Sequence, residues 1–318
     1  MDEEGFARGN ADELFRFRDQ LADFDPDAVL VMSADHVYRL DYRDVLDAHR
    51  DTGAECTLVT TSLPPGGDPG DHGVVEVSDE GRVTGFSYKP EDPPGDADVT
   101  ITAEVIVYDP TVLRDVLEEL HRETAADSDE GDTGLGDFGD LLVPRLVDRG
   151  RTHAFHHDGY WRDLGQPHHY LRAHHEILTD DVGVLSVPGW PVLSRLPQRA
   201  PARVLDGGEA VDSLLSPGSR VSGRVERSVI GPGVVVEPGA LVADSVVFAD
   251  AVVRAGARVH WTVLDTRSVV EGDARVGDPG ALALDDPDAV TLVGSDSTVA
   301  HGVVLEAGAR LEPGTTRG

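Results

Sequence analysis

The last third of the chain repeats itself every 17 residues, and no other feature restricts its possible folds as strongly. The triplets SVI, SVV and TVL begin at positions 228, 245 and 262, and the motifs VEPGA, VRAGA and VEGDA begin at 236, 253 and 270. Short β-branched segments separated by corner motifs are typical of a parallel β-helix, whose coils stack on one another. A β-sandwich of evenly spaced strands would give no reason for so constant a step. We therefore predict a β-helix over residues 211–318, after a proline-rich linker over 181–210.

Residues 1–180 have a different pattern, in which strands alternate with helices. Apolar strands are predicted over 27–35 and 55–63, a further strand over 102–109, and helices over 41–53 and 110–124. The alternating residues 73–90 predict a hairpin. Asn10, with Glu13 three residues later, predicts a helix cap with its reciprocal partner. We expect an α/β domain with a mostly parallel sheet and helices on its faces.

The composition argues against several classes of partner. With 59 acidic and 27 basic side chains, the net charge is −32, which leaves no excess cation to displace counterions from nucleic acid or an anionic membrane. The single cysteine, Cys56, gives no disulfide framework and fits a reducing cytoplasm. The acidic start MDEEGFARGN predicts no signal peptide, and no apolar run approaches the roughly 20 residues of a membrane helix. We expect a cytoplasmic protein.

Lys89 is the only lysine among the 27 basic residues. Because arginine serves everywhere else, a compact ammonium group here indicates a contact that a planar guanidinium does not fit, such as a point contact with a phosphate. The alternative is a surface lysine without a function. Composition alone leaves both interpretations open.

Two aspartates follow predicted strands. Asp35 ends the strand over 27–35, and Asp163 lies between a second predicted strand and a helix that begins at Pro167. In open α/β sheets, ligands bind at the carboxyl ends of the strands. A carboxylate there can hold Mg²⁺ against phosphate oxygens, although an aspartate at a strand end more often caps a helix. Together with Lys89, two such carboxylates would suit a phosphoryl or nucleotidyl transfer.

Six sequence blocks resemble, in order and at about the same spacing, those of the ADP-glucose pyrophosphorylase family, the glucose-1-phosphate adenylyltransferases. They are GNADELFRFR, SADHVYRLDY, HGVVEV, YKPEDPP, GDFGDLLVPRL and GYWRDLGQPHHYLRAH. Because that family also carries a C-terminal β-helix, the resemblance covers essentially the whole chain. It implies a Rossmann-like nucleotidyltransferase domain followed by a left-handed parallel β-helix. It further implies a homotetrameric enzyme of glycogen synthesis that converts ATP and glucose 1-phosphate to ADP-glucose and pyrophosphate.

The resemblance also assigns roles to residues of this chain. It implies that Lys89 holds the phosphate of the sugar 1-phosphate, that Asp35 and Asp163 bind Mg²⁺, and that Asp35 and Lys89 are catalytic. It places three more residues at the substrates, namely Gly9 and Asp12, which match the family's Gly-Thr-Ala-Asp-Ala loop, and Gly73, which matches a glycine that lets the main chain approach the sugar.

The chain departs from the family where the sugar would bind. The family's Glu-Lys-Pro is Tyr88-Lys89-Pro90 here, which removes an acid that accepts hydrogen bonds from glucose hydroxyls. Its Ser-Met-Gly block is Thr102-Ala103-Glu104, so Glu104 either replaces the lost acid or obstructs the pocket. We therefore count Tyr88, Thr102 and Glu104 among the expected substrate-binding residues.

The family's Gly-rich loop, of the type Gly-Gly-x-Gly-x-Arg-Leu, holds the nucleotide triphosphate and has no counterpart before Gly9. We therefore expect an N-terminally truncated nucleotidyltransferase domain that does not bind ATP productively and is inactive by itself. Detectable pyrophosphorolysis of ADP-glucose would contradict this expectation.

Two other functions stay open at this point. Hexapeptide acyltransferases also use a β-helix, with a histidine at a coil edge as base, and His260 is the candidate within the regular coils. A non-catalytic regulatory or scaffold subunit would use the β-helix for assembly. Only the transferase requires glucose 1-phosphate binding that depends on Lys89.

Overall fold

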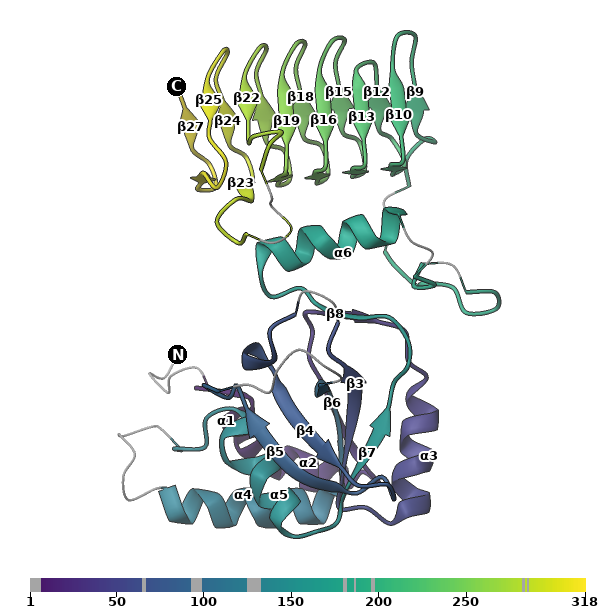
Figure 1. The fold of residues 1–318 in the computed structure, drawn as a ribbon, viewed down its shortest axis with the longest axis vertical. Coiled ribbons are helices and arrows are strands. Elements are labelled where there is room, and N and C mark those ends of the chain that lie inside the picture. The colour runs from purple at the N-terminus through teal and green to yellow at the C-terminus, as the bar shows by residue number, and fades with distance from the viewer. Residues whose placement is uncertain are drawn as a thin grey trace. The chain divides into compact units, whose positions relative to one another are not determined.

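The computed structural model describes residues 7–64, 67–92, 99–124, 133–179, 182–185, 187–195, 198–281, 284 and 286–318. The chain forms two compact units (Figure 1). The first is Met1–Ala34 with Tyr38–Trp161, and the second is Asp35–Val37 with Arg162–Gly318. Within the described residues, no helix combines the length and the apolar content that a membrane span requires.

A mixed sheet forms the centre of the first unit. Its strands follow the order β5-β4-β6-β3-β7, and β1 also pairs with β6. The strands are β1 (Val29–Met32), β3 (Cys56–Ser62), β4 (Gly73–Val77), β5 (Val83–Tyr88), β6 (Thr100–Tyr108) and β7 (Thr152–His156). β4 and β5 form the predicted hairpin, in which Gly73 lies opposite Tyr88.

The expectation of a mostly parallel sheet is wrong. β6 runs antiparallel to β1, β3 and β4, and β5 runs antiparallel to β4. Among the described strands of this sheet, only β3 and β7 pair in parallel. β6 is buried along most of its length, and a continuous apolar run reports burial without reporting strand direction. For this reason the apolar pattern did not reveal a central antiparallel strand.

Helices cover both faces of this sheet (Figure 1). Val45 of α3 packs with Val59 and Val105 on one face, whereas α1, α4 and α5 pack with Leu58 and Ile106 on the other. Alternate residues of β3 and β6 therefore belong to two separate cores. The helices are α1 (Asn10–Arg16), α2 (Arg18–Phe24), α3 (Tyr42–Thr52), α4 (Pro110–Thr124) and α5 (Val143–Asp148), with short helical turns at Pro69–Asp71 and Phe138–Leu142.

We expected Asn10 to cap helix α1, but Asn10 is the first residue of that helix. Its Oδ1 accepts a hydrogen bond from Phe138 N at 2.5 Å, and two main-chain N–H groups of the first turn donate to Gly136 O. The cap residue is Gly9, where a Cβ atom would lie 2.3 Å from the main chain of Gly136. A loop that is distant in sequence therefore provides the hydrogen-bond acceptor for N–H groups at the start of the helix, and local sequence cannot indicate such a partner.

Asp12 anchors α1 from inside the first unit. Its side chain is fully buried and accepts hydrogen bonds from Arg16 Nε at 2.8 Å, Thr133 Oγ1 at 2.9 Å and Arg8 N at 2.9 Å. Burial alone would raise the pKa of this carboxyl group, but the three hydrogen bonds and the charge of Arg16 outweigh burial and lower it. The ionised carboxylate therefore stabilises the folded state.

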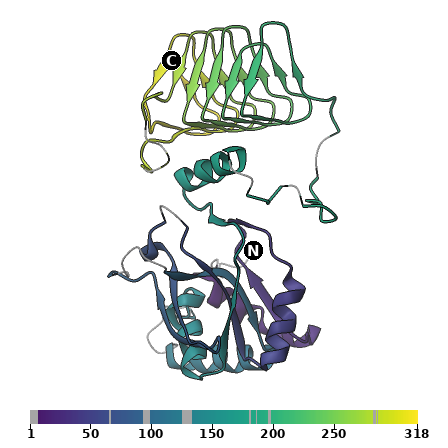
Figure 2. The ribbon, with the colours of Figure 1, turned by 45° about the vertical axis from the view of Figure 1, so that its right-hand side comes forward.

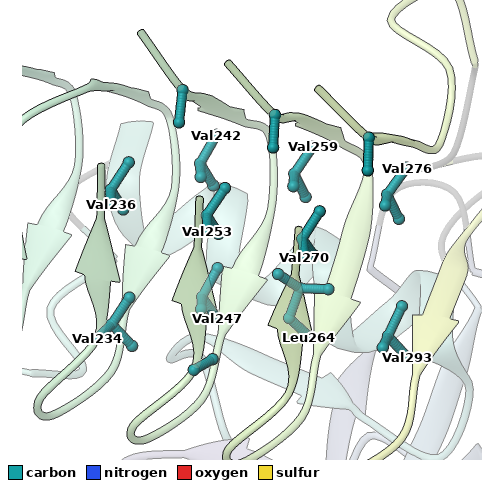
Figure 3. Packing of buried hydrophobic residues seen from close by; sticks show 14 of the residues in the cluster. Val234, Val236, Val242, Val247, Val253, Val259, Leu264, Val270, Val276 and Val293 are labelled. Carbon is teal, nitrogen blue, oxygen red and sulfur yellow. The ribbon is translucent and has the colours of Figure 1, made fainter. Parts of the chain in front are cut away.

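Most of the second unit is a β-solenoid, which confirms the predicted β-helix. Equivalent strands of successive coils pair in parallel and in register, so that Val225 pairs with Val242 and Val242 pairs with Val259. The side chains of these ladders fill the interior (Figure 3). The step of 17 residues therefore stacks valine on valine from one coil to the next.

Three parallel sheets run along the solenoid, and Figure 2 shows their coils following one another from green to yellow. The first contains β10 (Glu209–Val211), β13 (Arg224–Glu226), β16 (Leu241–Ala243), β19 (Arg258–His260), β22 (Arg275–Val276) and β25 (Val304–Leu305). The second contains β11 (Leu214–Leu215), β14 (Val229–Ile230), β17 (Val246–Val247), β20 (Thr262–Leu264), β23 (Thr291–Val293) and β26 (Arg310–Leu311). The third contains β9 (Arg203–Val204), β12 (Arg220–Val221), β15 (Val235–Val236), β18 (Val252–Val253), β21 (Val269–Val270), β24 (Thr298–Val299) and β27 (Thr316–Arg317).

The solenoid begins earlier and is less regular than its repeat indicates. β9 pairs in parallel with β12, so the first coil begins at Arg203, within the segment that we expected to be a linker. Between β22 and β23 the period breaks, because Thr262 pairs with Thr291 rather than with a residue 17 positions later. The coil that follows this insertion still pairs in register with the next, as Val293 does with Leu311.

Helix α6 (Pro167–Thr179) packs against the solenoid within the second unit. His175 stacks on Trp261, with ring centroids 5.1 Å apart, and Tyr170 stacks on Phe248 at 6.2 Å. Burial lowers the pKa of His175, although the nearby charge of Asp244 opposes this effect. The imidazole is therefore held mainly as a neutral ring against the indole.

We expect Asp12→Asn to destabilise the first unit by about 1–3 kcal/mol at pH 7, because the variant loses charge-assisted hydrogen bonds in a buried setting. A carboxyl group with a lowered folded-state pKa stabilises the protein above its unfolded-state pKa, and this stabilisation disappears as the pH falls through the folded-state value. The difference between the variant and the parent chain should therefore shrink on acidification. Urea denaturation at several pH values measures it. Asp19→Asn, at a side chain that is 82% exposed, is the control and should change stability little at any pH.

Candidate functional site

Three side chains that can bind a metal ion meet where β2 (His36–Tyr38) and β8 (Trp161–Asp163) pair. Asp35 precedes β2, His36 is the first residue of β2, and Asp163 is the last residue of β8. One ligand atom from each of the three residues lies within 4.8 Å of the other two. No other group of this kind occurs among the described residues. The two predicted metal ligands, which are far apart in sequence, are therefore neighbours.

Main-chain N–H groups hold the backbone of Asp35 and the carboxylate of Asp163 in place. Leu164 N donates a hydrogen bond to Asp35 O at 2.8 Å, and Gly165 N donates to Asp163 Oδ1 at 2.6 Å. A Cβ atom at Gly165 would lie 3.1 Å from Asp163 Oδ1 and 3.4 Å from Asp35 Oδ2, so both carboxylates converge over this glycine. Converging carboxylate oxygens fit a hard divalent cation such as Mg²⁺.

An ion pair ties the strand that carries Asp163 to helix α6. Arg162 is 7% exposed, and its Nε and Nη2 donate to the two carboxylate oxygens of Glu176 at 2.9 and 2.5 Å. Two parallel charge-assisted hydrogen bonds fix the direction of both side chains. The position of Asp163 therefore depends on the packing of α6.

His36 is the member of this group that the sequence analysis missed. Its side chain is 4% exposed, whereas that of Asp35 is 57% exposed, and its Nε2 lies 3.7 Å from Asp35 Oδ1. The signal was present, because histidine is a metal ligand and follows a predicted ligand directly in the sequence. Our prediction considered only the carboxylates.

Lys89 directly follows β5, as predicted, and its main chain is in the left-handed region at φ 42°. Its N–H donates to His72 O at 2.9 Å. The side chain is exposed, and Nζ lies 5.0 Å from the centre of the Tyr88 ring. A non-glycine residue in this region costs about 1–3 kcal/mol, so its surroundings must impose the conformation.

Tyr88 is part of those surroundings. Its ring lies 5.9 Å from that of Phe138 and against Gly139, where a Cβ atom would lie 2.2 Å from the ring. Its hydroxyl donates to Asp137 Oδ2 at 3.4 Å. Burial raises the pKa of the Tyr88 phenol well above its usual range, and nearby carboxylates, including Glu104, raise it further. The phenol therefore remains a hydrogen-bond donor.

Three more predicted site residues, Gly73, Thr102 and Glu104, lie near Tyr88 and Lys89. We call this region of the sheet the Tyr88 corner. Gly73 is opposite Tyr88, and a Cβ atom there would lie 2.8 Å from Phe86 and 2.9 Å from Thr102, so side chains fill the space in front of this glycine. Thr102 Oγ1 accepts a hydrogen bond from Glu104 N at 3.1 Å. Glu104 has φ 52°, at a place where the register of β6 against β3 shifts. Such a bulge redirects a side chain, in this case a carboxylate.

Asp137, which the sequence analysis also missed, links the helix α1 region to this corner. Its Oδ1 accepts a hydrogen bond from Asn10 N at 3.3 Å, and its Oδ2 accepts one from the Tyr88 hydroxyl. Asp12 itself points into the protein, so it supports this region from inside. The predicted site residues thus form one set in the second unit, Asp35 and Asp163, and one in the first, Gly9, Asp12, Gly73, Tyr88, Lys89, Thr102 and Glu104.

His260, the candidate base of an acyltransferase, lies in β19 and pairs in register with Ala243. Burial lowers the pKa of its imidazole, although the nearby charge of Asp244 opposes this effect. The pairing with Ala243 places His260 at a regular ladder position of the solenoid.

Two protein-family models match the chain. The model described as "Nucleotidyl transferase" matches residues 1–180, and the model described as "GlmU-like, C-terminal hexapeptide" matches residues 200–282. A glucose-1-phosphate adenylyltransferase of Streptomyces coelicolor is 35% identical over 72% of this chain and 60% of its own length. Glucose-1-phosphate adenylyltransferases of Frankia casuarinae and Desulfitobacterium hafniense are 32% and 28% identical, over 85% and 97% of this chain and 69% and 75% of their own lengths.

The chain spans 60%, 59% and 58% of the lengths of the relatives from Streptomyces coelicolor, Streptomyces avermitilis and Corynebacterium kroppenstedtii. The transferase model matches more than half of this chain, and the hexapeptide model falls on the solenoid. Sequence blocks, fold and comparisons agree, and the chain therefore belongs to the nucleotidyl transferase family, among the ADP-glucose pyrophosphorylases.

Proposed function

We propose that this protein is a sugar-1-phosphate nucleotidyltransferase, most specifically a glucose-1-phosphate adenylyltransferase that forms ADP-glucose and pyrophosphate from ATP and glucose 1-phosphate. The observation that carries the proposal is the convergence of Asp35 and Asp163 at the β2–β8 pairing. It is supported by the only lysine of the chain at the exit of β5. Assembly as a homotetramer is part of the same proposal and rests on the family alone.

The proposed reaction needs no side-chain nucleophile. A phosphate oxygen of glucose 1-phosphate attacks the α-phosphorus of ATP, a new oxygen–phosphorus bond forms, and the bond to the β-phosphate oxygen breaks to release pyrophosphate. Asp35 and Asp163 would hold Mg²⁺, which supplies positive charge against the phosphate oxygens. Lys89 binds the sugar phosphate and orients it for attack. Catalysis of this kind rests on positioning and on neutralisation of charge.

Local positive charge matters more in this protein than in most, because its net charge is −32. A phosphorylated ligand that approaches the Tyr88 corner meets the carboxylates of Glu104, Asp137 and Asp140, whose charges raise the pKa of the Tyr88 phenol. Lys89 is exposed at this corner. The affinity for a sugar phosphate should therefore depend strongly on this one ammonium group.

We expect Lys89→Ala to weaken the binding of glucose 1-phosphate by about tenfold or more, because a charge-assisted hydrogen bond contributes about 1.5–3 kcal/mol. Lys89→Arg should recover only part of the affinity, since a guanidinium does not replace a point contact. Isothermal titration calorimetry on the full chain measures both variants. Arg82→Ala, at an exposed position of the same hairpin, is the control and should bind as the parent does. Equal binding by parent and Lys89→Ala would favour the scaffold function instead.

A second prediction concerns the packing beneath Lys89. Gly139→Ala should weaken glucose 1-phosphate binding several-fold, because the new Cβ atom would displace the Tyr88 ring over which the Lys89 ammonium lies. If the effect acts through this ring, adding Gly139→Ala to Tyr88→Ala should change the affinity little further, and a double-mutant cycle measures the coupling. Tyr88→Phe keeps the ring and loses only the hydroxyl, so it should weaken binding less than Tyr88→Ala does. Additive effects of the two changes would show that Gly139 acts by another route.

A further inference from the structure

The candidate metal site contains a nitrogen donor beside its two carboxylates. The His36 side chain is 4% exposed, and a ring nitrogen lies within 4.8 Å of ligand oxygens from both Asp35 and Asp163. Its Nε2 is 3.7 Å from Asp35 Oδ1, which is longer than a hydrogen bond. A buried imidazole therefore faces a site whose other donors are oxygens.

The kind of donor influences which divalent ion binds. Mg²⁺ binds oxygen ligands, keeps several of its waters and demands near-ideal octahedral geometry. Imidazole nitrogen suits first-row transition metals, and Mn²⁺ also accepts carboxylate and water oxygens. A set of one imidazole and two carboxylates thus matches Mn²⁺ and its heavier neighbours better than it matches Mg²⁺.

We propose that His36 is a third ligand of this site, so that the site binds first-row transition-metal ions, with Mn²⁺ as the first representative, in preference to Mg²⁺. This inference rests on the proposed function, in which Asp35 and Asp163 hold a divalent ion. It adds a ligand and an order of metal preference.

The geometry indicates how the three donors close on an ion. Metal–ligand bonds of about 2.0–2.2 Å place two donor atoms at most about 4.4 Å apart. The three donor atoms lie within 4.8 Å of one another, so they can close on an ion with little side-chain movement. The side chain of His36 is 4% exposed, and Asp163 Oδ1 accepts the hydrogen bond from Gly165 N. Asp35 is 57% exposed. Asp35 is therefore the ligand with the most freedom to adjust, and the side chains of His36 and Asp163 are more restrained.

A purely structural role for His36 predicts a different result. If the imidazole only supported Asp35 by packing, its removal would weaken Mg²⁺ and Mn²⁺ to a similar extent. If it is a ligand, its removal weakens Mn²⁺ selectively. The ratio of the two affinities therefore separates the two roles, independently of any catalytic assay.

The experiment uses the full chain, freed of metal with a chelator and titrated with MnCl₂, while electron paramagnetic resonance measures the free ion. Competition with MgCl₂ gives the second affinity. We expect one Mn²⁺ per chain, bound at least about tenfold more tightly than Mg²⁺. His36→Ala and His36→Asn should each weaken Mn²⁺ binding at least tenfold, because even the loss of a group that only supports a ligand costs about 10–100-fold in metal affinity. The same variants should weaken Mg²⁺ binding less than threefold. His301→Ala, at an exposed turn of the solenoid, is the control.

Electron spin-echo envelope modulation on the Mn²⁺-loaded chain tests coordination directly. Nitrogen coupling should be present in the parent and in His301→Ala and absent in both His36 variants. Circular dichroism in the presence of chelator checks that the variants fold. Equal affinities for the two ions in the parent, or nitrogen coupling that survives in the His36 variants, would overturn the proposal.

Variants of the aspartates separate this inference from the proposed function. Asp35→Asn and Asp163→Asn should each lose both ions. If they do, and the His36 variants change both affinities equally, the inference about His36 fails and the proposed metal site stands. If the aspartate variants bind both ions as the parent does, the metal site of the proposed function fails, and the inference about His36 fails with it.

Discussion

The pairing of β2 with β8 is the contact on which the candidate metal site depends. Asp35 and Asp163 come from distant parts of the sequence, and the hydrogen bond from Leu164 N to Asp35 O joins the two segments beside the carboxylates. Bringing such distant segments together has an entropic cost that surrounding contacts must offset. The part-buried ion pair between Arg162 and Glu176 is one of these contacts. Because Glu176 belongs to α6, which packs on the solenoid, the regular coils contribute to the metal site by holding α6 in place.

Features that are encoded within a few neighbouring residues could be predicted from the sequence. The 17-residue repeat predicts the solenoid, because each coil repeats the same local pattern and pairs with the next coil in register. The hairpin of β4 and β5 needs only its own alternation and turn. Helix α3 is stopped by Gly53, as predicted, which caps it in the left-handed conformation at φ 60° that glycine adopts without strain.

Features that depend on a remote partner could not be predicted in this way. β6 runs antiparallel to three neighbouring strands, and the residues of β6 alone do not indicate this direction. Asn10 is a residue type that often caps helices. Here, however, Gly136 O already accepts hydrogen bonds from N–H groups of the first helical turn, and the Asn10 side chain accepts one from Phe138 N instead. Asp137 connects two segments only after folding. Local patterns singled out Asp35, Lys89 and Asp163 but left their roles open. The family resemblance implied one role for each, yet it pointed to neither His36 nor Asp137.

The Tyr88 corner shows how a site can keep its hydrogen-bonding capacity after one residue changes. A glutamate before the lysine would accept hydrogen bonds from sugar hydroxyls, whereas the phenol of Tyr88 stays protonated because burial and nearby carboxylates raise its pKa. Acceptors are still present, however, since the β6 bulge redirects Glu104 and the Tyr88 hydroxyl bonds to Asp137. On the proposed function, a sugar would meet a donor at position 88 and acceptors at positions 104 and 137. The corner therefore redistributes donors and acceptors around Lys89, and the specificity for the sugar should follow that new arrangement.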